Sequence, residues 1–220
     1  YRRQRQMCIR DSILVDNESD NKKVKNFKYR NEIKIIQNKK NEGFSKANNI
    51  GIDYALKNNF DYTILINNDT IVEKNLIEVL LKTAQAKNFS VVQPLILKYS
   101  GKEIWNAGGR INYFFGNFIT RKKVGNSLNS SHELTEWLTG CCCLFKTKIF
   151  KEIGKLDESF FAYYEDVDWS LRIKDLGYSL KLVNTSLVYH YGSKSSENSS
   201  FEGSLSPKVH YLNFKNHDYY

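Results

Sequence analysis

The sequence predicts an α/β fold with a mixed, mostly parallel sheet flanked by helices and a small antiparallel excursion. Three observations support this prediction. In the first part of the chain, short apolar runs alternate with segments of helical period, and this alternation is typical of a layered sheet covered by helices. The middle of the chain combines β-branched and aromatic residues with Gly and Asn turns, which favours antiparallel strands. With 220 residues, 41% of them apolar, one core and one domain are expected.

The first predicted strands are three short apolar runs that end in polar residues. They are ILVDN (13–17), EIKIIQN (32–38) and YTILINND (62–69). Each run has the length of a strand buried on both faces. We therefore expect each of these segments to form a buried strand of a mostly parallel sheet.

Helices are predicted after the second and third of these runs. The residues that recur at helical spacing are Ala47, Gly51, Tyr54, Ala55 and Asn58 in the first helix, and Leu76, Leu80 and Ala84 in the second. Such spacing places apolar side chains along one face of a helix. Each helix should cover one face of the sheet with that stripe.

The rest of the chain alternates less regularly. Antiparallel strands are expected within residues 89–98, 103–114 and 116–126, and a strand is expected in EWLTGCCCLF (136–145). A short helix in 147–154 should end at Gly154, and a longer one from Glu165 to Leu176 should end at Gly177. YSLKLVN (178–184) and SLVYHYG (186–192) are predicted as two further strands.

Composition excludes some classes of protein and leaves others open. No run approaches the roughly 18 apolar residues of a membrane span, so a cytoplasmic protein is expected. Cys141, Cys142 and Cys143 are consecutive, which suits buried reduced thiols better than a disulfide framework. The net charge of +9 is compatible with phosphorylated ligands, anionic membranes or nucleic acid, and equally with a solvated surface rich in Lys. Residues 1–12 have no apolar period and are interpreted as an unrelated leader.

Polar side chains end the first three predicted strands, where ligands bind in open α/β sheets. These ends carry Asp16 and Asn17, then residues 38–41, then Asn67, Asn68 and Asp69. Asp and Asn also simply begin turns. Asp69 has two readings: it could hold a divalent cation, because Mg²⁺ and Mn²⁺ prefer hard oxygen ligands, or it could cap the following helix.

The predicted helix at Glu165 begins with an unusual concentration of acids. Glu165, Asp166 and Asp168 occupy its first turn, where carboxylates interact favourably with the helix dipole. They directly follow the aromatic segment 160–164, which could exclude water and raise a carboxyl pKa toward that of a general base. His190 ends a later strand run and could join Asp69 at a cation.

The motifs together resemble family-2 glycosyltransferases, specifically their rhamnosyltransferase-like branch. The matching strings are VDN (15–17), NEGFSKANNIGI (41–52), LINNDT (65–70), WLTGCCCLF (137–145), LDESFFAYYEDVDWSLR (156–172) and VYHYGSKS (188–195). Their order and spacing match as well. The resemblance implies a GT-A, Rossmann-like fold, a nucleotide-diphosphate sugar donor, a Mn²⁺ or Mg²⁺ cofactor and inversion at the anomeric carbon.

The resemblance also implies roles for individual residues. Asp166 would be the catalytic base, with Glu165 beside it, and Asp69 and His190 would be metal ligands. The expected nucleotide-sugar contacts are Asp16, Asn17, Asn41, Gly43, Asn48, Asn67 and Asn68. The expected acceptor-side residues are Trp137, Phe161, Tyr163 and Tyr164. The acceptor would be a cell-surface glycan or a lipid-linked glycan, with peripheral membrane association and no nucleic-acid partner.

Two other functions remain open at this stage. A sugar-phosphate nucleotidyltransferase would use similar carboxylates, and a non-enzymatic basic module would bind nucleic acid or membrane. The resemblance covers about residues 13–195, and we expect a catalytic domain over 13–200 with a helical extension over 201–220. The family's first strand and helix have no counterpart before VDN, so this chain alone is not expected to be fully active.

Overall fold

The computed structural model describes residues 11–19, 33–125, 132–191 and 207–217. Its strands are β1 Ile13–Asp16, β2 Lys34–Gln37, β3 Tyr62–Ile66, β4 Thr70–Val72, β5 Val91–Lys98, β6 Ile104–Asn106, β7 Gly109–Asn112, β8 Asn117–Thr120, β9 His132–Thr135, β10 Cys142–Lys146 and β11 Leu180–His190. Its helices are α2 Phe44–Lys57, α3 Leu76–Ala86, α4 Ile149–Glu152, α5 Glu165–Asp175 and α6 Pro207–His217.

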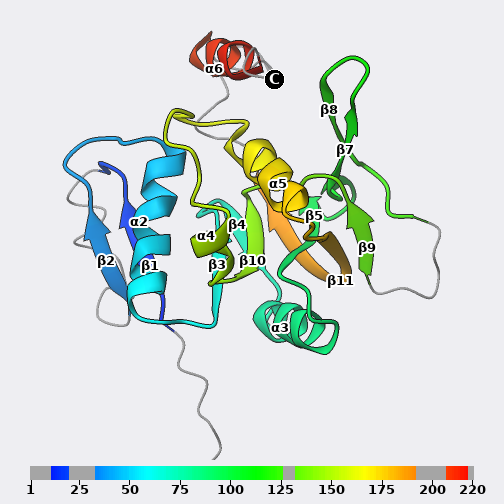
Figure 1. Ribbon diagram of the computed structural model, residues 1–220, viewed down its shortest axis with the longest axis horizontal. Coiled ribbons are helices and arrows are strands. Elements are labelled where there is room, and N and C mark those ends of the chain that lie inside the picture. The colour runs from blue at the N-terminus through cyan, green and yellow to red at the C-terminus, as the bar shows by residue number, and fades with distance from the viewer. Residues whose placement is uncertain (1–10, 20–32, 126–131, 192–206, 218–220) are drawn as a thin grey trace, which may run out of the picture.

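The strands form one large mixed sheet and two small ones (Figure 1). The seven-stranded sheet has the order β3-β10-β5-β11-β4, with β6 paired to β5 and β9 paired to β11. β1 and β2 form a separate parallel pair, and β7 and β8 form an antiparallel hairpin. α2 packs against both β1 and β3, so it joins the small parallel sheet to the large one.

Helices cover both faces of the large sheet, and the alternation along β10 shows why. Cys143 and Phe145 point to the face covered by α2, α4 and α5, whereas Cys142 and Leu144 point to the face covered by α3. Successive side chains of a strand face opposite sides, so one short strand contributes to both halves of the core. The three thiols of Cys141–Cys143 are buried and free, as predicted. Burial raises the pKa of Cys142 to about 12, which keeps its thiol protonated.

The α/β class, the flanking helices and the antiparallel excursion are as predicted, but the sheet contains more antiparallel pairing than expected. Among the described strands, only β1–β2 and β5–β11 pair in parallel. The extra antiparallel pairing comes from the path that the chain takes before β10. After the hairpin excursion, β10 enters between β3 and β5 and runs antiparallel to both.

Two local features also differ from the sequence prediction. The two runs expected as separate strands after residue 178 form the single strand β11. Its hydrogen-bond ladder with β5 is interrupted by a register shift between Val183 and Leu187 and then resumes, so both runs belong to one strand. The polar residues Asn184 and Thr185 lie in this irregularity. β4 was not predicted, since Thr70–Val72 is too short to give a periodic signal.

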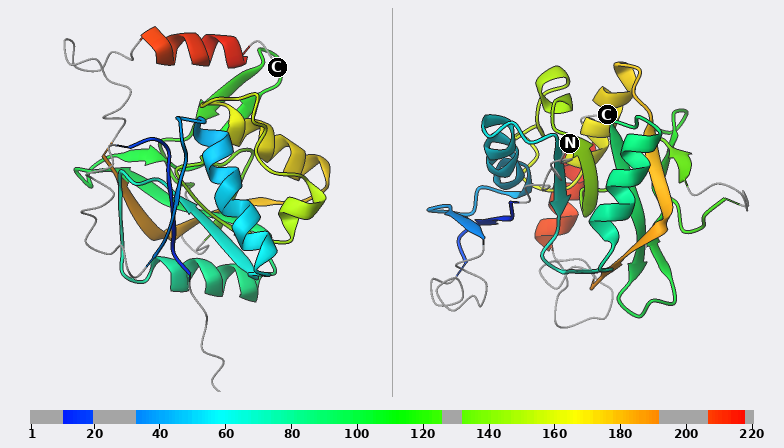
Figure 2. Two further views of the ribbon diagram at one scale, coloured as in Figure 1. Left: turned by 90° about the vertical axis from the view of Figure 1, so that its left-hand side faces the viewer. Right: turned by 90° about the horizontal axis from the view of Figure 1, so that it is seen from below.

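Figures 1 and 2 show which elements lie at the two ends of the molecule. α6 and the tip of the β7–β8 hairpin lie at one end, and α3 lies at the other. α6 is the described part of the predicted helical extension over 201–220. Residues 1–10 of the predicted leader lie outside the described residues. No helix in the described part of the chain is both long and apolar enough to span a bilayer.

Candidate active site

The predicted acid-rich helix start is present as the first turn of α5, preceded by a strained loop. Tyr163 and Tyr164 both have φ 71°, a left-handed conformation that is uncommon for aromatic residues. Two such residues in succession carry a conformational cost of order 1–3 kcal/mol each. The surrounding contacts therefore fix the loop in a geometry that the local sequence does not favour.

Asp166, in the first turn of α5, is held by two backbone hydrogen bonds. Its Oδ2 accepts a hydrogen bond from the backbone N–H of Gly140 at 2.9 Å, and its Oδ1 accepts one from the N–H of Val167 at 2.9 Å. Burial raises the pKa of the Asp166 carboxyl, and these backbone donors partly oppose the rise. The carboxylate is held in one orientation, and its raised pKa suits proton abstraction from a hydroxyl.

Glu165 has a different environment from its neighbour. It is buried, and its Oε2 has no hydrogen-bond partner among the described residues. Burial raises the pKa of Glu165 well above its usual value, and the nearby Asp166 charge raises it further. The two carboxyls therefore differ in their contacts: both oxygens of Asp166 accept hydrogen bonds, whereas Glu165 Oε2 is buried without a partner among the described residues.

Replacing Glu165 with Gln should make stability less dependent on pH. The unfolded carboxyl loses its proton above about pH 4.3. The folded one keeps its proton to higher pH, because its pKa is raised. Stability contributed by this proton is complete at low pH and is lost as pH rises through the folded pKa, at up to about 1.4 kcal/mol per pH unit.

Urea unfolding between about pH 5 and pH 8 measures this difference. The free energy of unfolding of the wild type should fall relative to that of Glu165→Gln as the pH rises. Glu78→Gln, which changes an exposed carboxylate on α3, should show no such relative trend. Parallel pH profiles for wild type and Glu165→Gln would contradict the buried protonated state.

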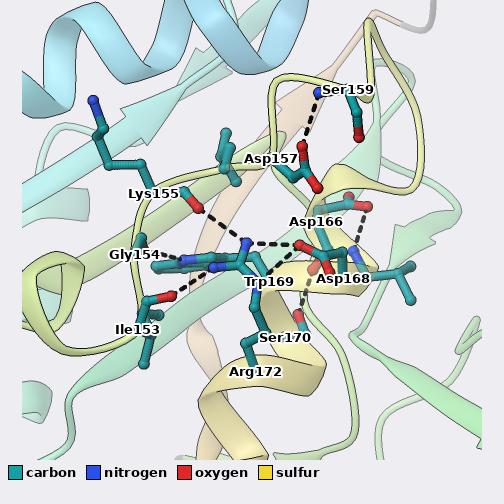
Figure 3. Close-up of polar contacts among 12 residues, drawn as sticks. Ile153, Gly154, Lys155, Asp157, Ser159, Asp166, Asp168, Trp169, Ser170 and Arg172 are labelled. Atoms are coloured by element: carbon teal, nitrogen blue, oxygen red, sulfur yellow. Dashed lines mark hydrogen bonds and ion pairs between the residues drawn. The ribbon is translucent and has the colours of Figure 1, made fainter.

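Arg172 fixes the position of α5 (Figure 3). Its guanidinium donates to Asp168 at 2.6 Å, to the Ile153 carbonyl at 2.6 Å and to the Lys155 carbonyl at 2.9 Å. Asp168 is thus the structural acid of the three, engaged in the helix pair expected from its i,i+4 spacing. Asp166 points elsewhere and remains available for chemistry.

Asp69 and His190 meet as the sequence predicted. The β3–β4 turn carries Asp69, and the last residue of β11 is His190; Asp69 Oδ2 lies 3.2 Å from His190 Nε2. The Tyr191 N–H donates to the Asp69 carbonyl at 3.0 Å, which ties the two segments together. Trp105 covers the imidazole, with 4.3 Å between ring centroids.

The donor atoms of this pair fit a divalent cation. Two ligands at right angles, each about 2.1 Å from one octahedral ion, lie about 3.0 Å apart. Asp69 Oδ1 is also buried without a partner among the described residues. Within the described ranges no group of three His, Cys, Asp or Glu residues gathers. A cation here would take two protein ligands, and a diphosphate and water would complete its shell.

A second polar cluster forms at the ends of β1 and β2. Asn17 donates to Asn41 Oδ1 at 2.9 Å and to the Gly43 carbonyl at 3.2 Å. Burial raises the pKa of Asp16, but hydrogen bonds from Ser19 and Gln37 outweigh this and hold the pKa below its usual value. Four of the residues predicted to contact the nucleotide sugar therefore lie together: Asp16, Asn17, Asn41 and Gly43.

The remaining predicted donor-side residues are placed differently. Asn48 donates to the Phe44 carbonyl within α2 at 2.9 Å, so its amide is engaged in its own helix. The Asn67 N–H donates to the Cys141 carbonyl at 2.9 Å, and Asn68 is exposed beside Asp69. Asn67 and Asn68 thus belong with the Asp69–His190 pair.

One turn, Thr139–Cys141, connects the two halves of the site. Its Gly140 N–H binds Asp166, and its Cys141 carbonyl binds Asn67. The charges of both Asp69 and Asp166 contribute to the raised pKa of the Cys141 thiol, behind burial as the main cause. The Thr139–Cys141 turn therefore links Asp166 to the segment that carries Asp69.

Sequence reasoning did not identify the residue that positions this turn. Gln93 is fully buried in β5; its Oε1 accepts from the Thr139 N–H at 2.8 Å, and its Nε2 donates to Asn106 at 2.8 Å. The available signal was one polar amide inside the apolar run VVQPLIL. A buried amide requires partners, so its position marked a polar network.

The acceptor-side loop is held from two directions. The Phe161 carbonyl accepts from the Phe44 N–H at 2.6 Å, which joins the loop to α2. From α6, Asn216 donates to the Ala162 carbonyl at 2.9 Å and to the Tyr163 carbonyl at 2.8 Å. Sequence analysis also missed Asn216, because no local pattern distinguishes it.

The aromatic residues predicted for the acceptor side occupy two environments. Phe161, Tyr163 and Tyr164 are half-buried in the loop. Trp137 is instead nearly buried beneath the base of the β7–β8 hairpin, and its Nε1 has no hydrogen-bond partner among the described residues. Phe44, at the start of α2, also lines the pocket beside Asp166.

Comparison with known proteins agrees with this geometry. The profile of glycosyl transferase family 2 matches residues 9–154. The chain belongs to this family. Similar proteins include the low-salt glycan biosynthesis hexosyltransferase Agl10 of Haloferax volcanii, 27% identical over 76% of this chain and 54% of its own length. Rhamnosyltransferase WbbL of Escherichia coli is 23% identical over 68% of this chain and 61% of its own length.

The family-2 chain also resembles a solved GT-A structure. GalNAc-T7, crystallised with UDP, GalNAc and Mn²⁺, superposes with a TM-score of 0.67 over 82% of this chain and 37% of its own, at 17% identity. The expected GT-A fold and the resemblance to the rhamnosyltransferase-like branch are confirmed. The chain spans a little over half the length of the two curated relatives.

Proposed function

We propose that this family-2 chain transfers a sugar, with inversion, from a nucleotide-diphosphate donor to a hydroxyl of a cell-surface or lipid-linked glycan. The observation that supports this most strongly is the Thr139–Cys141 turn: its Gly140 N–H binds Asp166, and its Cys141 carbonyl binds Asn67, two residues before the Asp69 that pairs with His190. Inverting displacement requires a base beside the incoming hydroxyl and charge compensation at the leaving group, on opposite sides of the reacting carbon.

In this proposal Asp166 removes the acceptor proton. Backbone N–H groups hold its carboxylate, and the half-buried rings of Phe161, Tyr163 and Tyr164 restrict water around it. The acceptor oxygen then attacks the anomeric carbon, the bond from that carbon to the diphosphate oxygen breaks, and the electron pair leaves with the diphosphate. Glu165, kept protonated by burial, adds no charge to repel the developing alkoxide.

In this proposal Asp69 and His190 would hold a divalent cation, Mn²⁺ or Mg²⁺. Bound there, it would neutralise charge on the departing diphosphate. Asp16, Asn17, Asn41 and Gly43 form a preorganised polar edge that suits the nucleoside. Family membership favours glycosyl transfer over the nucleotidyltransferase and the basic binding module that the sequence left open.

Calorimetry with Mn²⁺ and nucleoside diphosphates tests whether Asp69 and His190 bind the cation. Asp69→Asn should lower the Mn²⁺-dependent affinity for the diphosphate at least about tenfold, because it removes a charged ligand. Asp61→Asn, an exposed carboxylate just before the other end of β3, should leave the affinity unchanged. Nucleotide binding that is indifferent both to chelator and to Asp69→Asn would refute the cation site.

A further inference from the structure

Three consecutive aromatic residues at the tip of the β7–β8 hairpin contribute nothing to the core. Phe114 is 88% exposed, Tyr113 69% and Phe115 67%. Isolated exposed apolar side chains are ordinary on protein surfaces. Three adjacent rings on a projecting turn are not, and such clusters mark surfaces that bind something.

The tip is ordered by its own hydrogen bonds. Asn112 Oδ1 accepts from the Phe114 N–H at 3.1 Å and from the Phe115 N–H at 3.2 Å. The rings of Phe114 and Phe115 pack edge to face, with centroids 4.8 Å apart. From α5, Lys174 donates to the Tyr113 hydroxyl at 3.0 Å. A preorganised turn that displays its rings loses little conformational entropy on binding.

The base of the hairpin is basic. The segment 109–123 contains four basic residues and no acidic ones. Arg121 is paired with Glu133, and Lys122 donates to the Trp105 carbonyl. Arg110 and Lys123 are exposed and form no ion pair with any described residue.

Acidic groups near the hairpin do not cancel this charge. Glu133 is engaged by Arg121, and Glu136 lies 3.8 Å from Lys174. Arg110 projects from the strand face that also carries the exposed Ile119, its cross-strand partner. The hairpin therefore combines exposed rings with uncompensated cations.

We propose that the β7–β8 hairpin binds the surface of an anionic lipid bilayer. Tyr113, Phe114 and Phe115 insert at the level of the headgroups, and the exposed cations Arg110 and Lys123, at the base of the hairpin, attract the anionic surface. Aromatic rings concentrate at that depth in membrane proteins, and cations near an anionic surface add to the attraction. This inference requires neither donor nor metal and is independent of the proposed transfer reaction.

The shape of the tip favours a bilayer over a protein partner. Three aromatic side chains can bury about 450–750 Å². A stable protein interface takes roughly 800 Å² from each partner and needs a complementary surface, whereas the tip is narrow and convex (Figures 1 and 2). Insertion between lipid headgroups needs only the tip itself.

The orientation that follows suits an acceptor presented at a membrane. The hairpin tip and α6 lie at the same end of the molecule. Phe118 of β8 contacts Tyr164 of the loop before α5, with 5.7 Å between ring centroids. A protein docked by this hairpin would hold its acceptor-side loop near the bilayer.

Vesicle co-sedimentation of the 220-residue chain tests the proposal. The probes are vesicles of phosphatidylcholine alone and of phosphatidylcholine mixed with phosphatidylglycerol. Binding should be stronger to the mixed vesicles, weaken with added salt, and fall at least about tenfold in Phe114→Ser/Phe115→Ser. Arg110→Gln/Lys123→Gln should lose only the preference for anionic lipid.

The matched control is Leu176→Ser, which removes an equally apolar, 55% exposed side chain at the C-terminal end of α5. Its vesicle binding should equal that of the wild type. The tip rings pack against little, so thermal unfolding of the double variant should match the wild type and establish that it folds. Undiminished vesicle binding by the folded double variant would overturn the proposal. So would a tip-dependent dimer in analytical ultracentrifugation without vesicle binding.

Discussion

Asp166→Asn should reduce kcat for sugar transfer by about 10²- to 10⁴-fold, the range attributed to a positioned general base. The amide is isosteric, and it can still accept the hydrogen bond from the Gly140 N–H through its oxygen. It cannot take the acceptor proton at neutral pH. Affinity for the nucleotide should remain near that of the wild type, because the substitution leaves both Asp69 and His190 in place.

Asp168→Asn is the matched control for this substitution. It changes an acid in the same helical turn, but one whose carboxylate faces Arg172 and not the site (Figure 3). Its loss weakens a partly exposed ion pair, an effect of about 1 kcal/mol or less on stability, and kcat should change by less than about threefold. Single-turnover kinetics would separate chemistry from product release. Normal transfer by Asp166→Asn, or equal losses in both variants, would show that the base is another group.

Local patterns in the sequence predicted the ingredients of this site more successfully than their division of labour. Strand-end polar residues, the acids of α5 and the Asp69–His190 pair all follow from element boundaries, which periodicity reveals. The roles of Glu165 and Asp166 do not. They depend on which carboxylate meets the Gly140 N–H and which is buried without a partner, and both contacts involve distant segments.

The unpredicted parts of the fold have the same origin. Sheet order depends on the return of β10 between β3 and β5, which no local propensity encodes. Gln93 and Asn216 act through long-range hydrogen bonds to backbone groups. Burial is likewise not visible in the sequence: Trp137, an aromatic residue within a motif, lies buried beside Gly109 at the base of the hairpin.

Gly43→Ala should cost about 3 kcal/mol or more of stability, because it combines backbone strain with a clash. Gly43 has φ 86° and ψ 175°, a region accessible essentially only to glycine, at a cost of order 1–3 kcal/mol for other residues. An added Cβ would also lie 2.5 Å from the Phe161 carbonyl oxygen and 2.8 Å from its ring. Because the opposing atom is backbone, relief requires the loop itself to move, which adds a packing cost.

Gly177→Ala separates these two contributions. Gly177 also has positive φ, at 80°, but an added Cβ there would meet no atom within 4 Å. It should therefore cost only the left-handed strain, about 1–2 kcal/mol. Urea unfolding measures both variants, and equal losses would contradict a specific clash at Gly43.

The clash at Gly43 should also affect transfer in the protein that remains folded. The Phe44 N–H to Phe161 carbonyl bond joins the donor-side loop to the loop that carries Tyr163 and Tyr164. Displacing Phe161 would break this link and shift the segment leading to Asp166. Assayed well below its unfolding temperature, Gly43→Ala should lose kcat as well as donor affinity, whereas Gly177→Ala should lose neither. Measuring stability, kcat and donor affinity in both variants distinguishes coupling between the two loops from a simple loss of folded protein.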